Sequence, residues 1–438
     1  MSRKPHIPKR HIPNVSSYLR PSIDVNKLIQ QAVTYHLKGQ LDDAQKIYEQ
    51  ILKVNPKHFD ALKFTATLLT QKKQFIEALR FFESALVINS NNAEAHYNRG
   101  IVLQELKRFD EALQSYDKAI QLEPDYAGSY WSKSLLKILI GEYLEGWQLY
   151  EWRRKKDDTK NNYPNYSQPL WLGQDSIKGK KILIYSEQGL GDSIQFCRYL
   201  PMLKEYHPTD IIFQVEKYLV SLMSTLNNEI KIIEKGQLIT QFDYYCPLLS
   251  LPLVFKTTIH NIPTKNQYLY VDDDKNKYWI NKLGKKIKPR IGLVWSGSII
   301  HKNDHNRSIL LEKLLPLMHV SFEWHAIQKE YRPNDLEILK AHPEIQQHQE
   351  ELKDFSDTAA LVEQMDLIIS VDTSLAHLAG ALGKEVWIML PFMPDYRWML
   401  DRSDTPWYPS ATLFRQPIID DWDSVISNMK ESITKLFS

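Results

Sequence analysis

The stretch FDEALQSYDKAIQLEP, residues 109–124, contains the spacing that organises the first third of the chain. Its Ala112 and Tyr116 each have a counterpart of the same kind 34 residues earlier and 34 residues later. The small residues of this series are Ala44, Ala78, Ala112 and Gly146, and the aromatic residues are Tyr48, Phe82, Tyr116 and Tyr150. A second small residue recurs earlier in each unit, at Ala32, Ala66, Gly100 and Ser134. A period of this length predicts pairs of amphipathic helices that bury their apolar faces by stacking.

The period resembles the tetratricopeptide repeat, in which small residues let paired helices approach closely and aromatic residues fill the gaps between pairs. About three and a half units run over residues 25–155 and predict an N-terminal helical solenoid. We expect the periodic residues to form its core. The last unit, GEYLEGWQLYEWRR at 141–154, is expected to dock the solenoid onto the region that follows. The resemblance implies a concave surface that binds a protein or peptide partner.

Composition excludes several classes of protein. The chain has 438 residues, enough for about two to four domains. Its 55 basic and 53 acidic side chains give a net charge of +2, which is no footprint for nucleic-acid binding. The two cysteines, Cys197 and Cys246, lack a metal-binding or redox spacing and fit a reducing compartment. Since no stretch approaches the ~18 consecutive apolar residues of a membrane span, we expect a cytoplasmic protein.

The first 24 residues are basic and interrupted by prolines, and they contain no apolar segment of the kind found in a secretory signal. Their composition predicts a disordered arm. This arm is either a solvated tail or a segment that contacts an acidic surface or anionic lipid.

The pattern changes after residues 156–178, a polar segment with scattered prolines and glycines that we interpret as a linker. Short apolar strands then alternate with helical segments, first over 179–285 and again over 286–438. Strands are predicted at 181–187, 210–216, 230–236, 289–298, 321–329, 366–372, 385–391 and 411–416, and Asp243 in the stretch 242–252 is expected to start a strand or a loop. Helices are predicted at 192–206, between the strands at 210–216 and 230–236, and at 308–318, 357–365, 373–382 and 422–437. This alternation predicts two α/β domains with parallel sheets, which bind ligands at the carboxyl ends of their strands and can face each other across a cleft.

The stretch SVDTSLAHLAGALGKEVWIMLP, residues 370–391, places a helix directly after a buried strand. The strand ends at Asp372, Thr373 and Ser374 open the helix as its cap, and His377 lies one turn further on. Free N–H groups at such a helix start attract an anion. The alternative is an ordinary capped helix with a histidine satisfied by its neighbours.

The loop SGSIIHKNDHNRSI, residues 296–309, follows the first strand of the second α/β domain. Lys302 and Arg307 in this loop suit a diphosphate, whose charge they can neutralise. The next strand end offers Gln328 and Lys329 for a base or a ribose. The alternative is a solvated polar loop.

The same loop leaves a metal site open as another alternative, because it contains His301, Asp304 and His305. The loop is short and has neither helical nor paired-cysteine spacing, so we predict a site without metal.

The stretch SEQGLGDSIQF, residues 186–196, is a glycine-rich turn between a strand and a helix. Ile194 stands where a dinucleotide fingerprint needs glycine, which disfavours a dinucleotide oxidoreductase, and the P-loop pattern is missing too. Gly189 and Gly191 form a tight turn that brings Asp192 to the start of the helix. Asp192 either caps that helix or accepts a proton from an attacking hydroxyl group.

Three motifs together resemble the heptosyltransferase-like glycosyltransferases (family 9), which have the GT-B fold of two Rossmann-like α/β domains. They are LIYSEQGLGDSIQF at 183–196, GLVWSGSIIHKNDHNRSI at 292–309 and DTSLAHLAGALGKEVWIMLP at 372–391. The resemblance covers about residues 180–420. The fold class that we expect is therefore α plus α/β, a tetratricopeptide solenoid followed by a GT-B module.

The resemblance also implies roles for single residues. It makes Asp192 the base, and it makes Thr373, Ser374 and His377 contacts of the donor's diphosphate or sugar. Lys302 or Arg307 would contact phosphate. Such relatives invert the anomeric centre and use no metal; the nucleotide sugar is a substrate, and no cofactor is implied.

The joined architecture is also similar to protein O-linked glycosyltransferases, whose repeats hold the acceptor protein, although the donor motif here is of the heptosyltransferase type. We therefore expect a glycosyltransferase that moves a sugar from a nucleotide-sugar donor to an acceptor hydroxyl held by the repeats. The alternative is a repeat scaffold with a GT-B-like module that binds partner proteins without catalysis.

Overall fold

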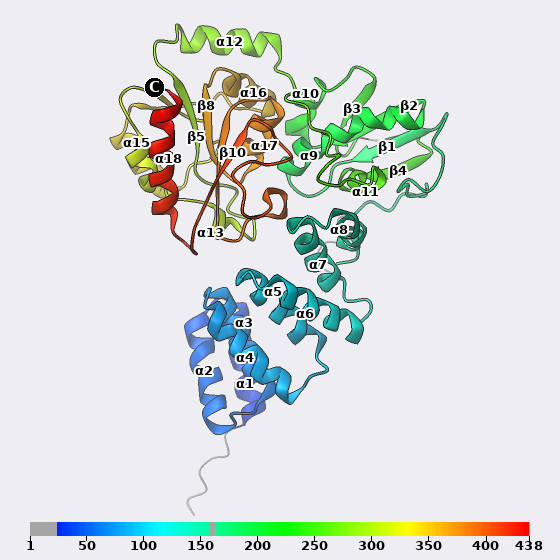
Figure 1. Cartoon of the computed structure of the whole chain (residues 1–438), viewed down its shortest axis with the longest axis vertical. Helices are drawn as coiled ribbons and strands as arrows, with labels where there is room; N and C mark the ends of the chain where they lie inside the picture. The colour runs from blue at the N-terminus through cyan, green and yellow to red at the C-terminus, as the bar shows by residue number, and fades with distance from the viewer. Residues whose placement is uncertain (1–23, 157–162, 238, 240, 438) are drawn as a thin grey trace, which may run out of the picture. The chain divides into compact units, whose positions relative to one another are not determined.

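The computed structural model describes residues 24–156, 163–237, 239 and 241–437 (Figure 1). The chain separates into two compact units, one ending at Leu106 and one beginning at Lys107. The predicted arm lies outside the described residues except for Asp24, which caps the first helix by accepting a hydrogen bond from the backbone N–H of Lys27. No helix in the described part of the chain is long and apolar enough to cross a membrane.

The first unit consists of five α-helices over its described residues. They are α1 (Val25–Leu37), α2 (Leu41–Val54), α3 (Phe59–Gln71), α4 (Phe75–Ile88) and α5 (Ala93–Glu105). Side chains at Asp24, His58 and Asn92 cap α1, α3 and α5 by accepting a hydrogen bond from the backbone N–H three residues later. Each cap satisfies one of the N–H groups that a helix start leaves without a partner, which fixes where the first helix of each pair begins.

The periodic residues are core, as predicted. Ala32, Ala44, Tyr48 and Leu68 form one fully buried cluster in the first unit. The series members in the later repeats, including Ala112 and Tyr116, are buried as well. The 34-residue period is therefore a packing period.

The second unit begins with the rest of the repeats, α6 (Phe109–Leu122), α7 (Ala127–Leu139), α8 (Tyr143–Tyr150) and a 3₁₀ helix at Glu151–Lys155. Gly146 brings α8 against α7 so closely that a Cβ atom there would lie 2.5 Å from Cγ1 of Ile138. This position of the series therefore needs glycine for packing rather than for backbone freedom.

Two parallel sheets follow. The first has the order β3-β2-β1-β4 and the second the order β10-β9-β8-β5-β6-β7. The strands of the first sheet are β1 (Lys181–Tyr185), β2 (Asp210–Val215), β3 (Ile230–Glu234) and β4 (Tyr244–Pro247). Those of the second are β5 (Arg290–Val294), β6 (Glu323–Ala326), β7 (Ile345–Gln347), β8 (Leu367–Val371), β9 (Val386–Leu390) and β10 (Ala411–Arg415).

Helices connect these strands, as the predicted alternation requires. Those of the first sheet are α9 (Leu190–Phe196), α10 (Val220–Met223) and α11 (Leu251–Val254), and α12 (Asp273–Leu283) leads to the second sheet. The second sheet has α13 (Asp304–Arg307), α14 (Leu311–Leu314), α15 (Pro333–Ala341), α16 (Phe355–Glu363), α17 (Ser374–Ala381) and the C-terminal α18 (Trp422–Leu436).

The strand order fixes where a ligand could bind. In each sheet the first strand lies between the second and the fourth, so the chain reverses its direction of travel there: at β1 and β4, and at β5 and β8. Open parallel sheets form a crevice at this switch point, outside the carboxyl ends of the two strands. The glycine-rich turn follows β1, the basic loop follows β5 and the Asp372 motif follows β8.

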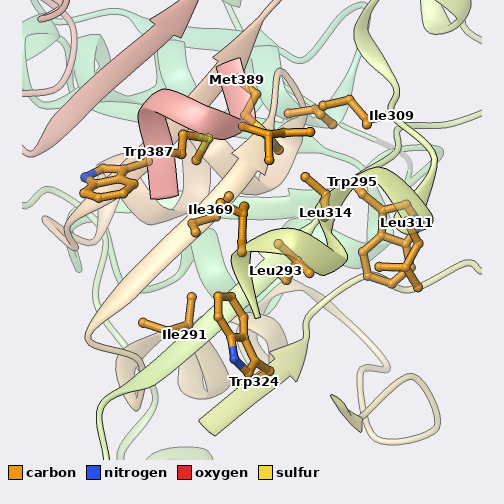
Figure 2. Close-up of a cluster of buried hydrophobic side chains, with 14 of the residues drawn as sticks. Ile291, Leu293, Trp295, Ile309, Leu311, Leu314, Trp324, Ile369, Trp387 and Met389 are labelled. Carbon is orange, nitrogen blue, oxygen red and sulfur yellow. The ribbon is translucent and has the colours of Figure 1, made fainter. Parts of the chain in front are cut away.

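The strands of the second sheet carry buried apolar side chains that form a hydrophobic core. Figure 2 shows part of this core, where Ile291 and Leu293 of β5, Ile369 of β8 and Met389 of β9 come together. Such fully buried strands are typical of a parallel sheet covered on both faces. The core holds the strand ends, and hence the motifs that follow them, in fixed positions.

Some predicted elements differ from the observed ones. The predicted helix 192–206 is α-helical only to Phe196 and continues as a 3₁₀ helix that contains Pro201. The predicted helix 308–318 shrinks to α14 and a 3₁₀ turn that contains Pro316. Proline has no N–H to donate and its ring clashes with the preceding turn, which ends each α-helix.

The described part of the predicted linker is packed onto the first sheet. Leu170 forms a parallel bridge with Tyr245, and Trp171 is fully buried, its indole N–H donating to the carbonyl of Asp175 at 2.8 Å. The apolar side chains in this polar segment therefore act as anchors.

Arg153 fastens the end of the repeats to the first sheet, as expected for the tryptophan-rich last unit. Its side chain is fully buried, and its Nη2 donates to Glu187 Oε1 at 2.5 Å and to Ser250 Oγ at 2.9 Å. Its Nη1 donates to Glu151 Oε1 at 2.7 Å. Glu187 follows β1 and Ser250 follows β4, so this ion cluster lies beside the switch point of the first sheet.

Arg153→Met is expected to lower the free energy of unfolding of the second unit by about 3–5 kcal/mol, because it leaves the Glu187 and Glu151 carboxylates buried without their countercharge. Urea unfolding followed by tryptophan fluorescence measures the loss. Lys178→Met, on an exposed side chain of the same unit, is the control and should change stability by less than about 0.5 kcal/mol. Equal stability of the two variants would contradict the role given to the cluster.

Two histidines are buried together at the edge of the second sheet. His325 Nδ1 on β6 lies 3.0 Å from His348 Nε2, which follows β7. Burial, together with the neighbouring His348 and Arg290, lowers the pKa of His325 to about 3, and burial together with the charge of Lys282 lowers the pKa of His348 to about 4. Both rings are therefore neutral in the folded chain at pH 7.

This pair predicts a loss of stability in acid. The unfolded chain takes up protons below the ordinary histidine pKa of about 6.5, and the folded chain does so only near pH 4 and below. The free energy of unfolding should fall by on the order of 1 kcal/mol per histidine for each pH unit below 6. Denaturant unfolding between pH 7 and 4.5 checks this, and His348→Gln should remove the share of one histidine from the slope, on the order of 1 kcal/mol per pH unit. An identical slope in the variant would count against the pair.

Candidate functional site

Asp192 is held from two sides. Its Oδ2 accepts a hydrogen bond from the backbone N–H of Gly189 at 2.8 Å, and its Oδ1 forms an ion pair with the guanidinium of Arg397. Only 13% of the side chain is exposed. Burial raises the pKa of Asp192, and the charge of Arg397 opposes that rise. The carboxylate therefore caps α9; its role as a base stays a prediction.

Arg397 lies in the 3₁₀ turn Tyr396–Trp398 between β9 and β10. Its Nε donates to Gln195 Oε1 at 2.6 Å and its Nη1 to Asp395 Oδ1 at 2.7 Å. None of the sequence motifs contains this residue. The available signal was its position in a loop that follows a buried strand, at the same sheet edge as the other motifs.

The start of α17 faces the glycine-rich turn. Thr373 caps the helix through its Oγ1, which accepts from the N–H of Leu375 at 3.3 Å, and Ser374 is the first helical residue and partly exposed. Burial and the negative charge of Asp395 raise the pKa of Asp372 to about 6. A buried carboxyl group with a raised pKa at a sheet's switch point is typical of functional sites.

His377 lies beneath this helix start. Its Nδ1 is 2.9 Å from the hydroxyl of Tyr408, and its ring stacks on Trp398 with centroids 5.4 Å apart. Burial lowers the pKa of His377 well below its ordinary value, so the ring is neutral. Nδ1 of the ring is thus held within the fold, and a contact of His377 with a donor stays a prediction.

The first and third motifs touch. A Cβ atom on Gly191 would lie 2.8 Å from Cδ2 of His377 and 3.2 Å from Cα of Ser374. Helices α9 and α17 pack directly against each other, and Figure 1 shows them side by side. The glycine at 191 therefore permits the close approach of the two sheet edges.

The structure distinguishes the two basic candidates of the β5 loop. Arg307 Nη1 donates to the carbonyl of Asp372 at 2.9 Å, and its guanidinium lies over Gly297, where a Cβ atom would be 2.6 Å from Nη2. Lys302 is exposed on the loop surface. Arg307 is thus at the switch point, beside the start of α17.

The carboxylate of Asp304, part of the metal alternative, is engaged otherwise: it accepts from Ser308 Oγ at 2.7 Å and pairs with Arg332. In the described residues no group of three or more potential metal ligands comes together.

The side chains of Gln328 and Lys329 form hydrogen bonds within the protein. Gln328 Oε1 accepts from the backbone N–H groups of Trp295 and Ser296, and its Nε2 donates to Ser296 Oγ at 2.6 Å. Lys329 Nζ donates to the carbonyl of Gln349 at 2.7 Å. Gln328 therefore ties the ends of β5 and β6 together, and any contact with a base or ribose stays a prediction.

Comparisons with known proteins agree with the repeats. Tetratricopeptide-repeat family profiles match residues 38–93 and 93–126. The chain is 25% identical over 331 residues to Protein FlbA of Caulobacter vibrioides, an alignment that covers 68% of this chain and 54% of that protein. The chain thus spans about half the length of this curated relative. A match to 68% of the chain must extend beyond the repeats at 25–155 into the α/β region.

Solved structures resemble part of the chain. MamA from Desulfovibrio magneticus is 19% identical, with a TM-score of 0.28, over 32% of this chain and 78% of the other. PilF of Pseudomonas aeruginosa is 23% identical, with a TM-score of 0.29, over 31% and 62%. The tetratricopeptide repeats, shown by the family profiles and by the helix pairs, indicate a protein-interaction role.

Gly191→Ala is expected to destabilise the second unit by about 1–3 kcal/mol, because the added methyl group meets a ring held between Trp398 and Tyr408. Gly189→Ala is the comparison, since a Cβ there would meet only Asp192 Oδ2, at 3.1 Å. Thermal unfolding of both variants measures the difference. A Gly191→Ala protein as stable as Gly189→Ala would show that the α9–α17 contact is loose in solution.

Proposed function

We propose that residues 179–438 are a GT-B-type glycosyltransferase that inverts the anomeric centre of a nucleotide sugar. One observation carries the proposal: the strand orders of two parallel sheets bring the Asp192 turn, Arg307 and the start of α17 to one place. These are the three motifs on which the family resemblance rests. The module boundary at 178/179 and the division at 285/286 are part of this proposal.

The chemistry is a single displacement. The acceptor oxygen attacks the anomeric carbon, the bond between that carbon and the phosphate oxygen breaks, and a nucleoside diphosphate leaves with the bonding electrons. Asp192 takes the proton of the acceptor hydroxyl. Arg307, the N–H groups at the start of α17 and the hydroxyls of Thr373 and Ser374 would balance the charge that grows on the leaving diphosphate.

The repeats would supply the acceptor. A tetratricopeptide array offers an extended surface to a polypeptide, so the acceptor hydroxyl belongs to a bound protein in this proposal. The last repeat of the array is fastened to the module through Arg153. A cytoplasmic location and the independence of a metal cofactor are parts of the same proposal.

A second candidate is a scaffold that binds proteins without catalysis. It is favoured by the close contact of Gly191 with Ser374 and His377 and by the ion pair that occupies Asp192. In that case the module's turn and helix serve to join the two sheets.

Calorimetry with UDP, GDP and ADP, followed by nucleoside diphosphate release from the corresponding sugars, separates the two candidates. A transferase should bind one diphosphate, and Arg307→Gln should weaken that binding about 10- to 100-fold because a charge-assisted contact is lost. Lys302→Gln should weaken it much less. Asp192→Asn should keep the binding and lose turnover by at least about 100-fold. If none of the diphosphates binds, the scaffold is the better description.

A further inference from the structure

The loop between β9 and β10, residues 391–410, contacts both the repeats and the first α/β region of the second unit. Phe392 lies under the ammonium group of Lys107, which precedes α6, at 3.8 Å from the ring centroid. Trp407 receives a hydrogen bond on its carbonyl from Arg198 Nη1 at 2.6 Å, and its ring meets that of Phe196 at 5.6 Å. Repeats, first sheet and second sheet thus converge on this segment.

Arg397 is the charged centre of this loop. Only 9% of the residue is exposed, and its three guanidinium nitrogens are bound by Asp192, Gln195 and Asp395. Two of these acceptors, Asp192 and Gln195, lie on α9. A planar fork with such fixed acceptors cannot rotate without breaking a charge-assisted hydrogen bond, so it fixes the orientation of the carboxylate that it meets.

The last repeat helix holds the loop beside α9. The hydroxyl of Tyr150 lies 3.5 Å from that of Tyr396, and the ring of Trp147 meets Tyr396 edge-on at 6.2 Å. The guanidinium of Arg397 in turn lies 4.4 Å from the centroid of the Tyr396 ring. A chain of contacts therefore runs from α8 through Tyr396 to Arg397 and ends at Asp192.

We propose that Arg397 is a positioning residue for Asp192, which orients the carboxylate and supplies its countercharge, and that the last repeat helix holds Arg397 in place. The inference rests on the proposed function, because it gives Asp192 the role of base. It also makes the end of the repeats a structural part of the site.

Besides Arg397, the titratable groups that act on Asp192 are the carboxylate of Asp395 and the buried hydroxyls of Tyr150 and Tyr396. Asp372 and His301 act on Arg397. Removing Arg397 leaves Asp192 buried beside the carboxylate of Asp395 and without its ion-pair partner. Its pKa must then rise, because burial and negative neighbours both disfavour the ionised form.

Asp192 accepts a proton only when it is ionised, so turnover requires a pH above the pKa of its carboxyl group. Arg397→Gln should move the acidic limb of the pH profile of kcat/KM to higher pH by about one unit or more. Arg397→Lys keeps the charge without the fork and should move the limb by less than half as much. Arg402→Gln, in the same loop and paired with Asp404, is the control and should leave the limb where it is.

The assay is nucleoside diphosphate release from the UDP, GDP and ADP sugars by the full chain, between pH 5 and 9. A purely structural role of Arg397 would lower turnover equally at every pH, and an unmoved acidic limb in Arg397→Gln would overturn the proposal while leaving the transferase intact. A wild-type chain that binds none of the three nucleoside diphosphates by calorimetry would instead refute the proposed function.

A second measurement reads the charge of Asp192 without turnover. The free energy of unfolding is measured against pH for wild type, Asp192→Asn, Arg397→Gln and the double variant. The effect of Asp192→Asn at each pH, measured once with Arg397 and once without it, reports the titration of the carboxyl group in the two settings. A midpoint that moves upward without Arg397 supports the proposal; the same midpoint in both settings overturns it.

Discussion

The ion pair between Asp192 and Arg397 connects the start of α9, after β1 of the first sheet, with the loop after β9 of the second sheet. A carboxylate and a guanidinium that are both largely withdrawn from water need each other, because either one alone would carry the full cost of its desolvation. Neighbouring groups complete the hydrogen bonding of this ion pair: Gly189 N–H donates to Asp192, and Gln195 accepts from Arg397. The ring of Tyr396 covers the guanidinium. The positions of α9 and of the β9–β10 loop are therefore set together.

The repeats have two separate parts to play. Their first helices form a compact unit of their own, while α6 to α8 belong to the same unit as the sheets. Tyr150 and Arg153 at the end of the repeats are buried against the α/β region, where Tyr150 contacts Tyr396 and Arg153 pairs with Glu187. This end of the repeats therefore packs against the rest of the chain, and these two side chains are not available to a partner protein.

Much of the architecture could be predicted from the sequence because it depends on local periodicity. The 34-residue spacing gave the helix pairs and the buried residues, and apolar runs such as that of β8 gave the strands. Elements without such a pattern were missed: β7 has three residues, two of them glutamine, and α12 carries its apolar residues among many charges. The α-helices α9 and α14 end at Phe196 and Leu314 and continue as 3₁₀ turns that contain Pro201 and Pro316, which shows how one imino acid overrides an otherwise helical pattern.

The residues of the candidate site could be predicted where a single strand-end loop contains them. Strand ends in a parallel sheet share an edge, so the loop with Lys302 and Arg307 could be placed beside Asp372 in advance, and Asp192 could be placed opposite them only by assuming that the two sheets face each other. The partners that decide their chemistry come from distant segments, such as Arg397 for Asp192 and Trp398 for His377. No periodicity links residues as far apart in the chain as Asp192 and Arg397, and the identity of such a partner depends on how the two sheets pack.

The aromatic contact between Phe196 and Trp407 has a consequence for ligand binding. Both side chains are fully buried, and they face each other across the boundary between the two sheets. A ligand that enters by separating the two sheets at this contact must expose the rings of Phe196 and Trp407 to water. That exposure costs on the order of a few kcal/mol. The apparent affinity of such a ligand would then be lower than its affinity for the open conformation. The factor is the fraction of molecules in which the two rings are separated. A substitution that loosens this aromatic contact would tighten binding while it lowers the stability of the fold.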